Sequence, residues 1–172
     1  TFISATKSLD NFHIRCNDGN AFEINSKILI NSSGLNSEIN TRKIFSLDNK
    51  YNLPIHLAKG HYFKYSGKHP FNNLIYPLSN EFSQGIHAGF DLSGQLRFGP
   101  DINWISNLDF SFDESVKDNF IDSIHQYWPD MNPEKLQPDY VGIRPKIQNQ
   151  NEKMRDFSIL DSKIHGCLLY TS

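Results

Sequence analysis

The sequence has few cysteines, little imbalance of charge and no long apolar run. Its 172 residues include two cysteines, Cys16 and Cys167, near opposite ends of the chain. This usage favours reduced thiols in a cytoplasmic protein over a disulfide framework. The 17 basic and 19 acidic residues leave a net charge of −2, which argues against a nucleic-acid partner. Apolar runs such as residues 28–30 (ILI) are too short to span a bilayer; membrane association and oligomeric state stay open.

Several motifs that identify a chemistry directly are also missing. None of the ten glycines is spaced as GxGxxG or GxxxxGK[ST], so the chain has no recognisable phosphate-binding loop. HExxH, CxxC and paired-histidine spacings are absent among the seven histidines, and we therefore predict no metal site. The GxSxG nucleophile turn is absent as well.

Aromatic residues make up 13% of the chain, and its polar and apolar residues alternate in many short segments. Strands are predicted over residues 12–16 and 21–24, joined by a turn at 17–20 (NDGN). A second hairpin is predicted around residues 91–94 (DLSG). Further strands are predicted over residues 27–31 (buried), 61–65, 74–77, 85–90, 95–99 and 157–160.

One long helix is predicted from Asp113, a natural N-cap, to Trp128, just before Pro129. Its apolar residues recur at helical spacing: Val116, Phe120, Ile124 and Trp128. A shorter helix is expected within residues 36–44, and a turn at residues 132–135. Many strands, few helices and hairpin connections indicate the α+β class, with a mainly antiparallel mixed sheet and one packed helix.

The segment 140–145 (YVGIRP) places an arginine in an apolar strand. Gly142 permits close approach of the backbone, and Pro145 ends or bends the strand. Arg144 is expected to be buried and therefore paired, because an unpaired buried charge is very costly. Its planar fork matches a carboxylate. That carboxylate belongs either to a protein Asp or Glu or to a bound substrate, and the residues alone leave both open.

Other candidate residues have two readings each. Strand alternation points His87 away from its neighbours Ile86 and Ala88, as a structural or a catalytic residue. Tyr62 belongs either to the core or to a pocket. Arg97 is expected to pair with a neighbouring carboxylate such as Asp101 rather than to bind a ligand. Trp104 and Trp128 are expected to be packing residues.

The motifs taken in order resemble FAD-dependent oxidoreductases of the D-amino-acid-oxidase-like group, in the L-2-hydroxyglutarate dehydrogenase branch. Residues 57–63 (LAKGHYF) are similar to the KGxYF strand of that group, and residues 30–35 (INSSGL) to its NAAGL turn, with serines in place of both alanines. The similarity extends over roughly residues 20–166. The other matching segments are residues 74–77, 85–87, 94–101, 127–129 and 141–146.

The resemblance implies a two-domain flavoenzyme in which FAD takes a hydride from the substrate carbon. It implies that Arg144 binds the carboxylate of a small-molecule substrate, and that Tyr62 and His87 act as catalytic, pocket-lining residues. In this scheme His87 accepts the hydroxyl proton. The implied cofactor contacts are Gly34, Leu35, Gly60 and Gly142.

The chain also departs from the family pattern. It lacks the glycine-rich unit that holds the FAD pyrophosphate, and residues 167–172 (CLLYTS) do not resemble the family's closing segment. We therefore expect a fragment, inactive alone. Its predicted parts are an FAD-domain remnant (1–50), a substrate-binding sheet domain (51–147) and a truncated return towards the FAD domain (148–172). An amino-acid oxidase of the same superfamily and a non-catalytic small-molecule binding domain are the alternatives.

Overall fold

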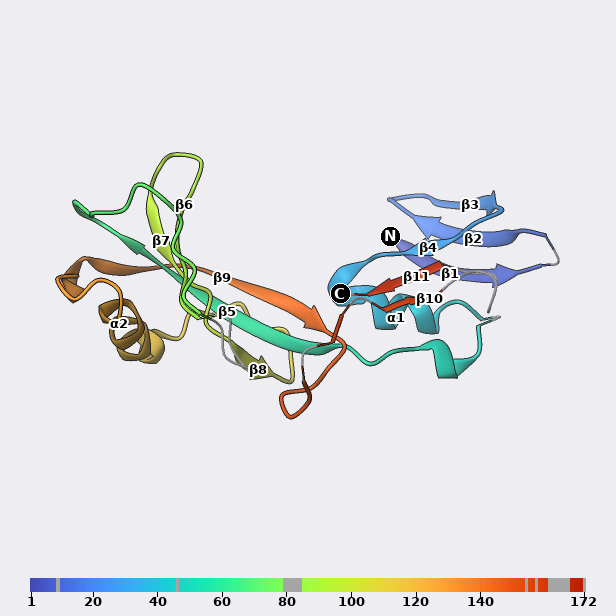
Figure 1. Cartoon of the computed structure of the whole chain (residues 1–172). Coiled ribbons are helices and arrows are strands. Elements are labelled where there is room, and N and C mark those ends of the chain that lie inside the picture. The colour runs from blue at the N-terminus through green and yellow to red at the C-terminus, as the bar shows by residue number, and fades with distance from the viewer. Residues whose placement is uncertain are drawn as a thin grey trace. The chain divides into compact units, whose positions relative to one another are not determined.

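A computed structural model describes residues 1–8, 10–45, 47–78, 85–153, 155–156, 158–160 and 168–171. The chain divides into two compact units, Thr1–His56 with Pro145–Ser172, and Leu57–Arg144. Figure 1 shows the ribbon with its elements labelled. Within the described ranges, no helix is long and apolar enough to cross a membrane.

The first unit begins with a three-stranded antiparallel sheet, β1 (Phe2–Lys7), β2 (Phe12–Asn17) and β3 (Ala21–Ser26). These strands lie side by side in Figure 1. The predicted hairpin is confirmed: Gly19 has a φ of 110° and its amide donates to the Asn17 side chain at 2.9 Å. A small core forms on one face of this sheet, around the buried residues Ala5, Phe12, Ile14 and Ile44.

A second small sheet in the first unit has the order β10 (Ser158–Leu160), β11 (Leu168–Thr171) and β4 (Ile30–Asn31), with β4 parallel to β11. The prediction of a buried strand over residues 27–31 is wrong in extent, because β4 has two residues and Ile30 is 56% exposed. An apolar run shows that burial is possible, not which residues a neighbouring element covers. The expected short helix is confirmed as α1 (Ser37–Arg42), between the 3-10 turns η1 (Gly34–Asn36) and η2 (Asn49–Tyr51).

The second unit contains five strands: β5 (His56–Tyr65), β6 (Ala88–Phe90), β7 (Leu96–Phe98), β8 (Asn103–Ile105) and β9 (Leu136–Lys146). They form one sheet of order β6-β7-β5-β8, with β9 paired to β5. The pairs β5–β7, β5–β8 and β6–β7 are antiparallel, as predicted, and β5 and β9 run side by side in Figure 1.

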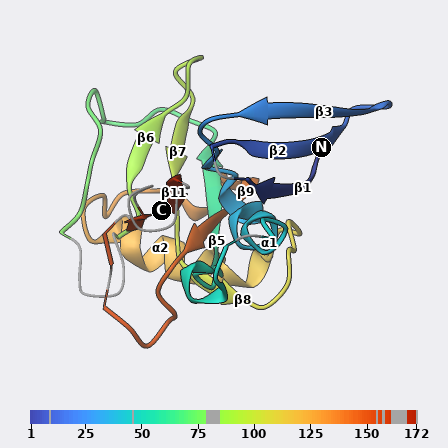
Figure 2. The ribbon, with the colours of Figure 1, turned by 90° about the vertical axis from the view of Figure 1, so that its right-hand side faces the viewer.

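The predicted long helix forms as η3 (Glu114–Val116) followed by α2 (Lys117–His125). Asp113 caps it by accepting the Ser115 amide at 2.9 Å. The regular helix ends at His125, before the predicted Trp128, and residues 126–128 complete a turn. A further short turn, η4 (Pro133–Lys135), is capped by Asn132 as expected. Figure 2 shows α2 running across strands β5, β6 and β7.

The helix covers one face of this sheet and buries its apolar residues there. Phe63, Phe98, Phe120 and Ile124 are each 0% exposed. Because side chains alternate along a strand, Tyr62 and Arg97 point to the opposite face. We name this second face, with its residues Tyr62, Arg97, Tyr140, Gly142 and Arg144, the open face.

Candidate functional site

Tyr62 and Tyr140 form a stacked pair on the open face. Their ring centroids lie 4.4 Å apart with the planes inclined by 11°. Partial burial is the main cause that raises the pKa of the Tyr62 phenol, and the Tyr140 charge acts in the same direction, against the lowering effect of Arg144. Tyr62 therefore stays protonated at neutral pH and is able to donate a hydrogen bond.

Arg144 is exposed, which corrects the expectation of a buried arginine. Alternation along β9 places it on the open face with Tyr140, whereas its neighbours Val141 and Ile143 are half-buried. None of the carboxylates in the described ranges lies within ion-pair distance of its guanidinium. The described protein thus offers no internal carboxylate for Arg144, and the guanidinium fork is available to a ligand.

The glycines near this site serve different purposes. A Cβ added to Gly142 would meet no atom within 4 Å, so open space lies over the backbone between Tyr140 and Arg144. A Cβ on Gly60 would lie 2.7 Å from the Pro100 Cβ. Packing against Pro100 therefore accounts for Gly60, and its predicted contact with a cofactor stays a prediction.

His87 lies in the same row of the sheet as Tyr62 but not beside it. Ala88 and Phe63 both pair with Phe98, so the next row across the three strands contains His87, Gly99 and Tyr62. His87 and Tyr62 are therefore separated by two strand spacings, about 10 Å. The Gly99 amide donates to the His87 carbonyl at 3.0 Å. The imidazole packs on the Tyr76 ring, with centroids 4.5 Å apart.

The position between His87 and Tyr62 requires glycine, which is Gly99. Its φ is 136°, and a Cβ there would lie 2.6 Å from the His61 carbonyl oxygen and 2.9 Å from Tyr62 Cδ1. The Tyr62 ring therefore lies directly against the Gly99 backbone. Because this central position has no side chain, a space is left between His87 and Tyr62 on this side of the sheet.

Arg97 pairs with carboxylates of the protein, as expected, but Asp101 is not one of them. Arg97 forms ion pairs with Asp91 at 3.1 Å and with Asp139 at 2.6 Å. The contact between Arg97 Nε and Asp139 Oδ2 is an ion pair without the alignment of a hydrogen bond. Asp101 instead accepts the His61 amide at 2.6 Å and lies 3.1 Å from His61 Nδ1. The cause is strand alternation, which points Arg97 to the open face and His61 to the covered face.

Sequence reasoning missed Tyr140 and Asp139. The Arg97 guanidinium carbon lies 5.4 Å from the centroid of the Tyr140 ring, so the tyrosine contacts both Arg97 and Tyr62. A signal was present in the sequence, because Tyr140 precedes Gly142 and Arg144 at the period of two that places strand residues on one face.

In the first unit, Gly34 and Leu35, the residues predicted to contact a cofactor, follow a hydrogen-bonded turn. Asn31 is buried, donates to the Ser37 carbonyl and Thr41 hydroxyl at 2.8 Å, and accepts the Ser33 hydroxyl at 2.6 Å. Gly34 has a φ of 57°, with no atom within 4 Å of an added Cβ. A cavity of about 240 Å³ adjoins this turn, lined in part by Asn31, Ser33 and Asn40.

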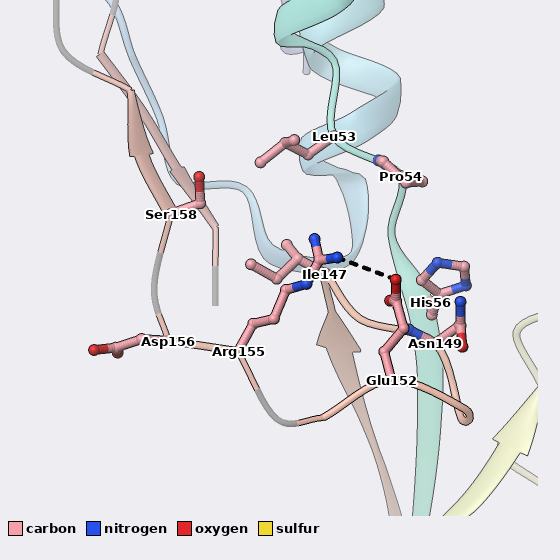
Figure 3. Close-up of a pocket in the computed structure, with 9 residues that line it drawn as sticks. All are labelled: Leu53, Pro54, His56, Ile147, Asn149, Glu152, Arg155, Asp156 and Ser158. Atoms are coloured by element: carbon pink, nitrogen blue, oxygen red, sulfur yellow. Dashed lines mark hydrogen bonds and ion pairs between the residues drawn. The ribbon is translucent and has the colours of Figure 1, made fainter.

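A larger cavity of about 550 Å³ lies elsewhere in the first unit (Figure 3). On its wall the Glu152 carboxylate binds Arg155 and accepts the Asn149 amide, each at 3.0 Å, so these two opposite charges are already paired. None of the predicted site residues lines it. Over the described ranges, no group of three or more His, Cys, Asp or Glu residues is arranged to hold a metal ion.

Comparison with known proteins gives one sequence match and several structural ones. The chain is 32% identical over 164 residues to "L-2-hydroxyglutarate dehydrogenase, mitochondrial" of Arabidopsis thaliana, which covers 88% of this chain and 34% of that protein. It matches L-alpha-glycerophosphate oxidase from Mycoplasma pneumoniae with FAD bound at a TM-score of 0.77 and 13% identity, over 99% of this chain and 44% of that one. No protein-family model matches the sequence.

In sequence and in fold, the chain resembles FAD-dependent oxidoreductases. A second structural match is glycine oxidase from Geobacillus kaustophilus, with a TM-score of 0.68 and 12% identity over 100% of this chain and 42% of that one. A third structural match is the glycerol-3-phosphate dehydrogenase from Bacillus halodurans complexed with FAD, with a TM-score of 0.68 and 15% identity. This match covers 98% of this chain and 34% of that one. The resemblance predicted from the motifs is thereby confirmed, and the chain spans about a third of the length of its curated relative.

Proposed function

We propose that this chain forms the substrate-binding part of an FAD-dependent enzyme that oxidises a 2-hydroxy acid. The observation that carries the proposal is the Arg144 guanidinium, which is exposed on the open face and has no carboxylate partner among the described residues. The 32% identity with a dehydrogenase named for L-2-hydroxyglutarate supports this substrate class. The predicted cytoplasmic location stays a prediction.

Arg144 would bind the substrate carboxylate through two parallel hydrogen bonds. A guanidinium and a carboxylate match in this geometry, and a charged pair of this kind is stronger than a neutral hydrogen bond. Fixing the carboxylate also fixes the neighbouring carbon, whose hydrogen is to be transferred. The open space over Gly142 gives the substrate room beside this guanidinium.

Tyr62 and His87 would act on the substrate hydroxyl from the same row of the sheet. The raised pKa of Tyr62 keeps its phenol protonated, so it would donate a hydrogen bond and orient the substrate. His87 would accept the hydroxyl proton, since histidine is the side chain that most often acts as a general base. The absent side chain at Gly99 leaves space between these two groups.

The described residues fit an FAD partner in part. Gly34 in the first unit and Gly142 in the second leave backbone open to a close ligand, whereas Gly60 is covered by Pro100. Leu35 follows Gly34 and stays a predicted contact. When bound, FAD would supply the hydride acceptor. The protein residues would bind the substrate, orient it and hold its proton.

The test is anaerobic reduction of the flavin in the intact protein reconstituted with FAD. We expect 2-hydroxy acids, including L-2-hydroxyglutarate, to bleach the flavin absorbance, and the matched 2-amino acids not to do so. Bleaching by amino acids alone would assign the chain to an amino-acid oxidase. A protein that binds FAD but is reduced by neither class would contradict the proposal.

A further inference from the structure

The Tyr140 ring is fixed, although it lies at the surface. Its side chain is 44% exposed, and a surface tyrosine usually moves freely. Here it stacks on Tyr62 at 4.4 Å and contacts the Arg97 guanidinium at 5.4 Å. Stacked rings and cation–π contacts both favour a defined ring orientation.

Arg97 is itself held in place from two sides. Asp91 binds its guanidinium at 3.1 Å and Asp139 at 2.6 Å. Asp91 is fixed in turn by the hairpin, because its side chain accepts the Ser93 and Gln95 amides at 2.8 and 2.9 Å. The Ser93 hydroxyl hydrogen bond is the main cause that holds the pKa of Asp91 below its usual range, so the carboxylate stays ionised opposite Arg97.

Tyr62, by contrast, has little else to hold its ring. Its neighbour across the sheet is Gly99, the residue after β7, which offers backbone and no side chain. The next position after Tyr140 on the same side of β9 is Gly142. Among the described residues, Tyr140 is the aromatic ring that packs face to face on Tyr62. The orientation of the Tyr62 phenol therefore depends on Tyr140.

We propose that Tyr140 is a positioning residue: anchored by Arg97 with its two aspartates, it holds the Tyr62 phenol in place on the open face. The catalytic importance of this role rests on the proposed function, whereas the orientation of Tyr62 does not. A purely structural Tyr140 would affect the melting temperature and leave the chemistry of Tyr62 unchanged. The two possibilities therefore differ in a property of Tyr62 itself.

The experiment compares Tyr140→Phe, which keeps the ring, with Tyr140→Val, which removes it and suits a strand, in the intact protein. Tyr62 ionisation is measured by tyrosinate absorbance, as the difference between each variant and the same variant with Tyr62→Phe. Tyr51→Leu is the matched control, because Tyr51 belongs to the first unit and, like Tyr140, has a cation over its ring, with Lys50 at 4.9 Å. Steady-state kinetics with a 2-hydroxy acid are measured on the same set.

We expect Tyr140→Val to shift the ionisation of Tyr62 to lower pH, and Tyr140→Phe to shift it less. We expect kcat/KM to fall about two- to tenfold in Tyr140→Val, the range that a ring–ring pair represents, mainly through kcat. Tyr140→Phe should lose less than Tyr140→Val, because it keeps the ring that stacks on Tyr62. Tyr51→Leu should stay within about twofold of the parent.

An ionisation of Tyr62 that is the same in Tyr140→Val and in the parent overturns the proposal, whatever the melting temperature does. If the parent protein oxidises no 2-hydroxy acid, the proposed function fails, and the ionisation measurement still decides the role of Tyr140. If Tyr140→Val does not fold, Arg97→Lys loosens the anchor and leaves both rings. A shift of Tyr62 in the same direction then supports the proposal, and no shift overturns it.

Discussion

The two faces of the five-stranded sheet are built from alternate residues of the same strands, but they differ in how their polar groups are used. On the covered face, His61 and Lys59 are buried, and each has a carboxylate partner, Asp101 at 3.1 Å and Asp109 at 3.0 Å. On the open face, Arg144 has no such partner among the described residues. Consecutive positions on a strand thus differ in whether the protein itself pairs their charges.

This difference indicates where to look for function. Burying an unpaired charge is costly, so polar groups under the helix must be satisfied by the protein itself. A charge left unpaired at an exposed position carries no such cost, and it is available to a ligand. The comparison therefore predicts that substitutions on the covered face change stability, whereas those on the open face change substrate binding and turnover.

The largest effect on stability is expected at Phe120. Its side chain is 0% exposed in the core between α2 and the sheet, and Phe120→Ala would leave a cavity there. We expect a loss of about 3–5 kcal/mol in the free energy of unfolding, measured by urea denaturation. Phe110→Ala, at a side chain that is 58% exposed, is the control and should change little. Equal effects of the two substitutions would show that the core is misplaced.

A smaller loss is expected from Asp101→Ala. This carboxylate accepts the His61 amide and the Asn103 side chain, each at 2.6 Å, and the substitution would leave these donors without their acceptor. The expected cost is about 2–3 kcal/mol, from the same urea measurement. Asp130→Ala, at an exposed aspartate, is the control. An Asp101→Ala protein as stable as this control would mean that His61 finds another partner.

Tyr127→Phe should cost about 1 kcal/mol at neutral pH, because the phenol donates to the Ile86 carbonyl at 3.0 Å. Burial raises the pKa of Tyr127 well above its ordinary value. The unfolded chain therefore loses this proton first, and parent stability falls as the pH rises above about 10. The phenyl ring of the variant cannot ionise, so the advantage of the parent should shrink between neutral and alkaline urea titrations. An advantage that grows with pH would contradict the assignment.

The smallest effect on stability is expected at Gly142 on the open face. An added Cβ meets no atom within 4 Å, so Gly142→Ala should leave the melting temperature unchanged or raise it slightly. If a substrate or cofactor approaches this backbone, the methyl group displaces it, and kcat/KM should fall about tenfold or more. Unchanged kinetics would remove Gly142 from the site.

The sequence predicted the elements whose local chemistry is distinctive. The hairpin at residues 17–20, the Asp113 cap and the apolar spacing of Phe120 and Ile124 all depend on neighbours within a few residues. The extent of β4 was mispredicted, because the burial of Ile28 and Ile30 depends on distant segments. The predicted boundaries at residues 50 and 147 stay predictions.

For the candidate site, the sequence predicted the side of a strand that a residue occupies better than it predicted the pairings. Alternation correctly separated His87 from the core residues Ile86 and Ala88. Arg97 was expected to pair with a neighbouring carboxylate such as Asp101, whereas its partners are Asp91 and, from another strand, Asp139. Sequence distance does not show which carboxylate the fold brings within reach of a guanidinium, and the apolar neighbours of Arg144 did not show that its own side chain stays exposed.

The most direct test of the account is Arg144→Lys in the intact protein, because lysine keeps the charge but loses the planar fork. Steady-state kinetics with a 2-hydroxy acid and a melting curve are measured on this one variant. The account predicts that substrate binding weakens by about 1.5–3 kcal/mol, that turnover falls with it, and that the melting temperature is unchanged. A lower melting temperature with an unchanged Michaelis constant and turnover would show that Arg144 serves the fold, and would contradict its role as the carboxylate-binding residue.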